Sequence, residues 1–300
     1  MKVHNIPKVI QVTQTGGSPI DVCTITILVE DTSRKKKLKA QHGLSLYLEA
    51  SSQDARIRIV FDTGPSQKIL SNNLKSLNLK LNDVDAIAVS HGHYDHTDGL
   101  PEIIKRTPFH IPVIFHPSLF APKFAYKPNL TYIGPSYKQS SITDNAVSIT
   151  NIKPLSITNG IMITGEIPLK TDFEKPYNLW KMGNEGIEQD LMIDEQALII
   201  DVNKKGIVVV TGCAHRGIIN TIRYAKRICN RGHVHAIVGG FHLSKASHRV
   251  IQSTVAELNV IEPEFLYPCH CTGAEAIKML CEHFGDRCQP VKTGDNIIFQ

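Results

Sequence analysis

Apolar residues along the chain fall into short runs separated by glycine, proline and charged residues, and most of these runs have the length of a β-strand. In the first half of the chain we expect strands over 9–12, 22–29, 44–48, 57–61, 84–89 and 111–115. In the second half we expect them over 146–149, 161–164, 196–202, 207–210, 234–238 and 296–299. Apolar residues recur with helical spacing over 66–77, 98–106, 218–228, 248–260 and 274–284. This alternation predicts a layered α/β fold.

Two stretches lack either periodicity, near 118–140 and near 170–192. The first contains Pro122, Pro128 and Pro135 among several aromatic residues, and the second contains Trp180, the one tryptophan of the chain. We interpret both as irregular, lid-like insertions in a single domain that spans residues 1–300. The alternative for the first stretch is a loop that packs its aromatic rings inward without contacting a substrate.

The composition is that of a globular protein with a sizeable core, because 42% of the residues are hydrophobic and 20% are charged. The net charge of +5 permits a small anionic substrate but does not favour nucleic acid. The basic run 34–37, with Lys39, is either a solvated loop or a rim that attracts anions. Seven cysteines without a framework spacing, and the lack of an apolar leader or membrane-length run, indicate a cytoplasmic protein. The oligomeric state stays open.

The stretch Ala88-Val-Ser-His-Gly-His-Tyr-Asp-His-Thr-Asp-Gly-Leu100 is typical of a metal site. It places His91, His93, Asp95 and His96 within six residues, directly after a buried strand. Imidazole and carboxylate groups suit zinc, iron or manganese, and two adjacent ions could share a hydroxide. The alternative is a polar surface turn, but with 14 histidines in 300 residues three in six is improbable by chance.

Three further histidines, His215, His242 and His270, also end β-rich runs and precede helical patterns. Layered α/β folds gather functional residues at such strand ends, so all three could reach the same metals. For His242 we favour substrate contact or proton transfer over metal ligation. Cys269 and Cys271 flank His270, and strand alternation predicts that both point away from the site as small buried residues.

Several of these segments, taken in order, resemble the metallo-β-lactamase superfamily. They are Phe-Asp-Thr-Gly (61–64), His-Gly-His-Tyr-Asp-His-Thr-Asp-Gly-Leu (91–100), Gly-Glu-Ile-Pro (165–168), Val-Thr-Gly-Cys-Ala-His-Arg-Gly-Ile-Ile-Asn (210–220), Gly-Gly-Phe-His-Leu (239–243) and Cys-His-Cys-Thr-Gly (269–273). Together they are similar to one branch, the 7,8-dihydropterin-6-methyl-4-(β-D-ribofuranosyl)aminobenzene-5′-phosphate synthases. The resemblance implies a four-layer αββα sandwich.

The resemblance also implies roles for individual residues. It implies two divalent metal ions, with zinc favoured and manganese, iron or magnesium as alternatives. The implied ligands are His91, His93, Asp95, His96, His215 and His270. Asp62 would orient the metal loop from behind the ligands, and Asp95 and His242 would handle protons. Glu166 and Lys170 become candidates for substrate contact.

Two departures from the family pattern affect these roles. The superfamily histidine expected ahead of the Gln196 strand is missing, and Cys213 stands where a bridging aspartate is expected, so His215 takes over one coordination role. The arginine that tends to follow Gly-Glu-Ile-Pro is Leu169 here, with Lys170 next.

The branch implies an alkyl transfer of methanopterin biosynthesis, in which an aminobenzene displaces diphosphate from a dihydropterin methyl carbon. The alternative is hydrolysis of an ester, lactone or phosphodiester by a metal-bridged hydroxide. A third possibility is a metal-binding protein without turnover, and the aspartate beside the histidines argues against it.

Overall fold

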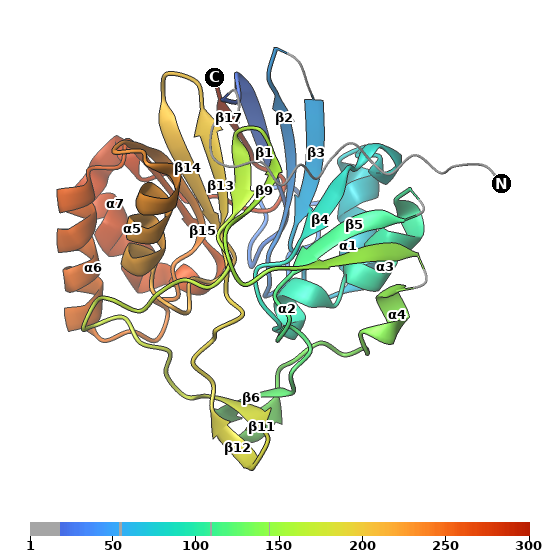
Figure 1. The fold of residues 1–300 in the computed structure, drawn as a ribbon. Helices are drawn as coiled ribbons and strands as arrows, with labels where there is room; N and C mark the ends of the chain where they lie inside the picture. Colours follow the sequence, from blue (N-terminus) through green and yellow to red (C-terminus); the bar gives the residue numbers. More distant parts are fainter. Residues whose placement is uncertain (1–18, 54–55, 109, 144) are drawn as a thin grey trace.

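The structure is a computed structural model that describes residues 19–53, 56–108, 110–143 and 145–300 (Figure 1). Two large sheets stand side by side at its centre, helices cover both outer sides, and a small sheet lies at one end. Within the described residues, no helix is both long enough and apolar enough to cross a membrane.

The strands form three sheets. The first has the order β17-β1-β2-β3-β4-β5-β8, with the bounds Asn296–Phe299, Val22–Val29, Ser45–Ser51, Arg56–Phe61, Ala86–Ala88, Ile111–Phe115 and Ala146–Thr150. The second has the order β16-β15-β14-β13-β10-β9, with the bounds Phe265–Cys269, Val234–Gly240, Gly206–Thr211, Leu198–Val202, Ile161–Ile163 and Leu155–Thr158. The third has the order β12-β11-β6-β7, with the bounds Gly186–Gln189, Leu179–Gly183, Lys123–Lys127 and Asn129–Tyr132.

The α-helices are α1 (Gln67–Ser76), α2 (Tyr94–Thr97), α3 (Leu100–Arg106), α4 (Ser140–Thr143), α5 (Ile218–Cys229), α6 (His248–Ile261) and α7 (Ala274–Phe284). Short 3₁₀ turns occupy Leu81–Asp83, His270–Thr272 and Gly285–Arg287. Sequence and local geometry agree at several helix ends. Ser66 and Ser247, for example, accept hydrogen bonds from the backbone of the first turns of α1 and α6.

Three apolar layers hold these elements together. The inner faces of the two large sheets pack on each other through residues such as Ile25, Leu48, Ile200 and Val210. The outer face of the first sheet packs on α1 and α3, and the outer face of the second on α5, α6 and α7. The predicted α/β fold, a four-layer αββα sandwich, is therefore confirmed.

Most predicted elements occur within a few residues of the predicted ends. The strands at 111–115 and 296–299 and the helix at 274–284 have the predicted bounds. The predicted strand at 9–12 lies outside the described residues. Strand β9 was not predicted, because its four residues are too few for a clear alternation.

The prediction of irregular structure near 118–140 and 170–192 is wrong in part, because each segment contributes a hairpin to the third sheet. Strand β6 pairs with β11, so the two segments stabilise each other across more than 50 residues of chain. The prolines stand between strands: Pro122 precedes β6, Pro128 lies in the β6–β7 turn and Pro135 follows β7. Prolines in these places leave the ladders intact.

The topology brings five strand ends to one edge of the sandwich. Strands β3 and β4 run parallel in the first sheet, and β14, β15 and β16 run parallel in the second. Their carboxyl ends therefore point the same way, and each is followed by one of the motifs described above. The short helix α2 begins at this edge, close to the small third sheet (Figure 1).

Candidate metal centre

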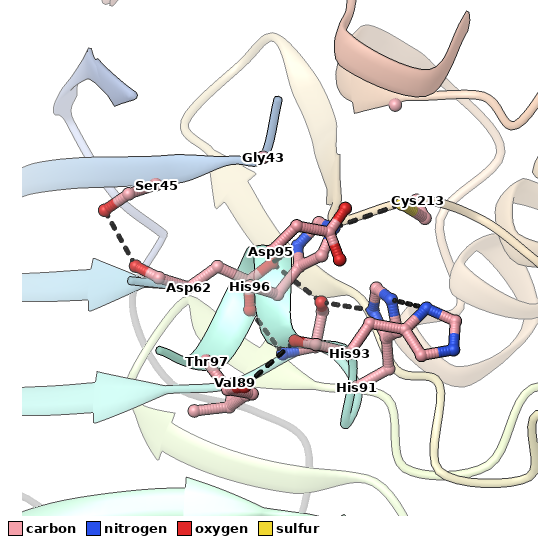
Figure 2. Close-up of polar contacts among 12 residues, drawn as sticks. Gly43, Ser45, Asp62, Val89, His91, His93, Asp95, His96, Thr97 and Cys213 are labelled. Atoms are coloured by element: carbon pink, nitrogen blue, oxygen red, sulfur yellow. Dashed lines mark hydrogen bonds and ion pairs between the residues drawn. The ribbon is translucent and has the colours of Figure 1, made fainter. Parts of the chain in front are cut away.

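The histidines predicted from strand ends meet at this edge. The ring centroid of His91, after β4, lies 4.6 Å from that of His93, 4.3 Å from that of His96 and 4.8 Å from that of His215, after β14. The His270 ring, after β16, lies 5.2 Å from the His96 ring. All five side chains are buried. Residues that are up to 179 positions apart in the sequence thus form one cluster. Figure 2 shows its part around the 91–96 loop, with His91, His93, Asp95, His96 and Cys213.

Asp62 lies beneath the metal loop and is completely buried. One of its carboxylate oxygens accepts a hydrogen bond from the Ser90 amide at 2.7 Å. The other lies 2.7 Å from both Ser90 Oγ and His96 Nδ1 (Figure 2). Its φ of 57° lies in the left-handed region, which aspartate tolerates better than most residues. These contacts fix the direction in which the loop leaves β4.

Three of the rings are each held through their Nδ1 atom. His91 Nδ1 lies 2.9 Å from Ser90 Oγ, His96 Nδ1 lies against Asp62 as above, and His270 Nδ1 lies 2.7 Å from Asp31 Oδ1. A partner at one ring nitrogen orients the imidazole and leaves the other nitrogen as the ligand atom. The Nε2 atoms of these rings lie among the other donors: that of His91 lies 3.0 Å from His93 Nδ1, that of His96 lies 3.1 Å from Cys213 Sγ, and that of His270 has no hydrogen-bond partner.

The cluster contains buried polar atoms that make no hydrogen bond. They are His93 Nε2, both ring nitrogens of His215 and His270 Nε2. Buried nitrogens almost always have a partner, so four unpartnered ones among neighbouring histidines indicate a site for bound ligands. Burial also lowers the pKa of His91, His93 and His215 well below the ordinary histidine value, which leaves neutral rings with free lone pairs. This donor set fits divalent metal ions.

The donors divide into two overlapping groups. Ligand atoms of His91, His93 and His215 lie within 4.8 Å of one another. Asp95 Oδ2 lies 3.5 Å from His270 Nε2 and 3.8 Å from His96 Nε2. Although burial alone would raise the pKa of Asp95, His96 and His270 hold it well below its ordinary value, so Asp95 is a carboxylate. His96 joins the two groups, because its ligand atom also lies within 4.8 Å of those of His91 and Cys213.

Two thiols complete the interior. Cys213 Sγ lies 3.1 Å from His96 Nε2, and the ligand atoms of Cys213, His270 and Cys271 lie within 4.8 Å of one another. The prediction that Cys271 points away is wrong. Residues 270–272 form a 3₁₀ turn and not a continued strand, so alternation does not apply to them. Cys269, the last residue of β16, does lie in the apolar core between the sheets.

Of the remaining candidates, His242 joins the cluster at its exposed side. Its ring centroid lies 4.0 Å from that of His215 with the rings tilted by 51°, and its ligand atom lies within 4.8 Å of those of Cys213 and His215. Glu166 is exposed and lies 3.2 Å from His116 Nε2. The exposed Lys170 donates its backbone amide to Asn220. The structure gives neither Glu166 nor Lys170 a contact with the histidine cluster, so their role in substrate binding stays a prediction.

Several polar residues at the site were not predicted from the sequence. Asp31 contacts both His270 and His42, and His42 Nε2 lies 3.4 Å from Asp95 Oδ2. Glu195 accepts hydrogen bonds from the amides of His215 and Arg216, and burial raises its pKa to about 7. One signal was present in the sequence: the acidic pair at 194–195 stands two residues before the apolar run 197–200.

Comparisons with known proteins agree with this geometry. Residues 53–153 match the family model of the metallo-beta-lactamase superfamily. The chain is 33% identical over 288 residues to 7,8-dihydropterin-6-methyl-4-(beta-D-ribofuranosyl)-aminobenzene-5'-phosphate synthase of Methanocaldococcus jannaschii, which covers 93% of this chain and 98% of the relative. An uncharacterized protein of the same archaeon is 32% identical over 260 residues, or 86% of this chain and 94% of that protein. Among solved structures, Tm1679, described as a metal-dependent hydrolase of the β-lactamase superfamily, superimposes with a TM-score of 0.78 at 27% identity and covers 92% of this chain and 98% of its own.

Proposed function

Because the chain belongs to the metallo-β-lactamase superfamily and matches a dihydropterin–ribofuranosylaminobenzene phosphate synthase along nearly its whole length, we propose that it catalyses the same transfer. The amine of the aminobenzene forms a bond to the methyl carbon of the dihydropterin. The bond from that carbon to diphosphate breaks, diphosphate leaves with the electron pair, and the amine loses a proton.

Two divalent ions, zinc by preference, would be held by His91, His93 and His215 on one side and by Asp95, His96 and His270 on the other. Imidazole nitrogens with a thiol nearby at Cys213 favour zinc over magnesium, which prefers oxygen ligands. The chemistry that such ions supply when bound is Lewis acidity toward the oxygens of the leaving diphosphate.

Side chains around the cluster would orient the imidazoles and accept the proton of the amine. Asp62, Ser90 and Asp31 keep the imidazoles in place, so little reorganisation is needed when substrate arrives. His242 stands at the open side of the cluster and is the candidate acceptor for the amine proton. Asp95, a carboxylate in contact with His42 and His270, is the alternative acceptor.

The observation that carries the metal-dependent part of this proposal is the set of unpartnered, buried nitrogens on His93, His215 and His270. The choice of transfer rests on the near full-length match to the synthase. The test is an assay of diphosphate release from the dihydropterin diphosphate with purified, zinc-loaded protein. We expect release only when the ribofuranosylaminobenzene phosphate is also present. Equal release without it would contradict the transfer.

A second candidate function is hydrolysis, and the superposition on Tm1679 favours it, since that protein is described as a hydrolase. The same histidines and Asp95 would then serve attack by water on an ester, lactone or phosphodiester. Turnover of p-nitrophenyl phosphodiesters or of lactones, with no second substrate, would support this function. The two assays use the same zinc-loaded preparation, so one sample decides between the reactions.

A small anionic substrate fits the loop between β1 and β2, whose two ends reach the metal centre through Asp31 and His42. Between these ends, Lys36, Lys37 and Lys39 are exposed, and no ion pair is recorded for them in the described structure. The loop is held in place because the buried Asn73 amide donates to the Lys39 carbonyl and its oxygen accepts from the Lys39 amide, each at 2.8 Å. We infer that these lysines attract the phosphate groups of the substrate.

The variant Lys36→Gln/Lys37→Gln is expected to raise the KM for the diphosphate substrate several-fold at low salt, with less effect on kcat, because exposed charge acts mainly on encounter. The matched control is Lys204→Gln/Lys205→Gln, an exposed pair in the β13–β14 turn at the opposite end of the sheet. Initial rates at 20 mM and 300 mM salt, concentrations of our choosing, measure both effects. Equal changes in the two variants would show that only net charge matters.

A further inference from the structure

Three consecutive buried residues, one position short of β13, contact both halves of the metal centre. Asp194, Glu195 and Gln196 have exposed fractions of 0%, 2% and 1%. Gln196 contacts the end of β4: its amide donates to the Ser90 carbonyl at 2.9 Å and its side chain donates to the Val89 carbonyl at 3.1 Å. This segment therefore starts from the strand end that carries the 91–96 loop.

Asp194 and Glu195 reach opposite loops of the site. Asp194 Oδ2 accepts a hydrogen bond at 2.8 Å from the amide of Gly92, the residue between His91 and His93. The two oxygens of Glu195 accept from the amides of His215 and Arg216 at 2.6 Å and 2.5 Å. The backbones of the 91–93 loop and of the 215–216 loop are thus hydrogen-bonded to two adjacent residues, Asp194 and Glu195.

Gly92 fits this contact closely. A Cβ atom built on Gly92 would lie 2.0 Å from the Leu119 carbonyl oxygen and 3.0 Å from Lys123 Cε, so only glycine lets the loop pack this closely on residues 119–123. Lys123 in turn binds Asp194 Oδ1 at 2.9 Å and Asp190 at 3.0 Å. Lys123 therefore holds the carboxylate that accepts from the Gly92 amide.

We propose that Asp194 and Glu195 are positioning residues that set the distance between the His91–His93 loop and His215, and through it the affinity of the metal position that these three histidines form. The proposal rests on the metal centre of the proposed function, but not on which reaction the protein catalyses. Residues that hold a ligand from behind typically change metal affinity by roughly 10–100-fold when replaced.

Glu195→Gln is the direct test. An amide has one acceptor oxygen, so one of the two backbone N–H groups at 215 and 216 would face a donor. The chain supplies a matched control in Glu174, a buried glutamate whose two oxygens accept from the amides of Ile219 and Asn220 at 2.8 Å and 2.9 Å. Glu174→Gln makes the same chemical change at amides four residues farther along the chain.

The measurement is zinc affinity by chelator competition, with Co²⁺ absorption as a second readout and thermal unfolding of the metal-free protein as a check on folding. We expect Glu195→Gln to weaken one of the two bound equivalents by roughly 10–100-fold and to alter the Co²⁺ spectrum. We expect Glu174→Gln to keep both affinities while lowering the Tm of the metal-free protein. Should Glu195→Gln fail to fold, Glu195→Asp keeps two acceptor oxygens on a shorter side chain and is expected to weaken the same equivalent.

Wild-type affinities in the Glu195 variants, or an equal loss in the Glu174 variant, would overturn the positioning role. Because no substrate is present in these titrations, absence of synthase activity would leave the result intact. Absence of metal binding in the wild-type protein would instead refute both this proposal and the proposed function.

Discussion

A protein in which His93 is replaced by alanine is expected to fold, to lose its zinc on dialysis and to show no turnover. His93 is 5% exposed, and its Nε2 atom faces the cluster without a hydrogen-bond partner. Its one hydrogen bond through the ring joins Nδ1 to His91 Nε2 at 3.0 Å, so little folding energy depends on it. As a direct ligand it should change metal affinity by more than the roughly 10–100-fold typical of residues behind a ligand.

The measurements are metal content after dialysis, diphosphate release and the Tm of the metal-free protein. His233→Ala is the control, because His233 is a half-exposed histidine at the start of β15, the end remote from the cluster, and contacts Glu264. We expect the control to retain zinc and activity. Full zinc content and activity in the His93 variant would refute its assignment as a ligand.

The site residues that could be predicted from the sequence are those that come directly after a β-strand in the chain. His91, His215 and His270 each come within four residues of the end of a parallel strand. Parallel strands that end at one edge bring such residues together whatever the loop lengths between them. The same reasoning placed the helices on the outer faces of the sheets.

The residues that the sequence did not reveal act through contacts between loops. Asp31 reaches His270 across 239 positions, and Asp194 reaches Gly92 across 102. No local spacing encodes such a contact, because its geometry is fixed only after both large sheets have packed. The small third sheet was not predicted for the same reason. Its two hairpins meet where Trp180 pairs with Phe124, and neither hairpin has the regular alternation of apolar and polar residues that predicts a strand.

Replacing Lys123 by methionine is expected to cost about 3–5 kcal/mol of unfolding free energy near neutral pH, the usual cost of removing one partner from a buried ion cluster. Lys123, Asp190 and Asp194 are each at most 1% exposed. Burial alone would lower the pKa of Lys123, but Asp194 and Asp190 outweigh it and raise that pKa, so the lysine stays charged. Methionine would leave two buried carboxylates without a cation.

The loss should shrink as the pH falls. Two neighbouring buried carboxylates raise one another's pKa, so the folded variant would bind a proton more readily than its unfolded chain. The stabilisation that the bound proton gives the folded variant is complete below the pKa of aspartate in the unfolded chain. It disappears as the pH rises through the raised pKa of the carboxylate in the folded variant. Urea unfolding of metal-free wild type and variant at pH 7.5 and pH 5, values of our choosing, measures the difference.

Lys181→Met is the control for this experiment, because Lys181 on β11 is the cross-strand neighbour of Lys123 but pairs with the exposed Glu188. An exposed ion pair contributes about 1 kcal/mol or less, and we expect no pH dependence beyond that of the wild type. Since Asp194 also holds the Gly92 amide, the Lys123 variant should in addition bind zinc more weakly, whereas the Lys181 variant should not. A Lys123 variant as stable as the control at pH 7.5 would contradict this prediction. It would show that, without the lysine, the two carboxylates are hydrated or share a proton.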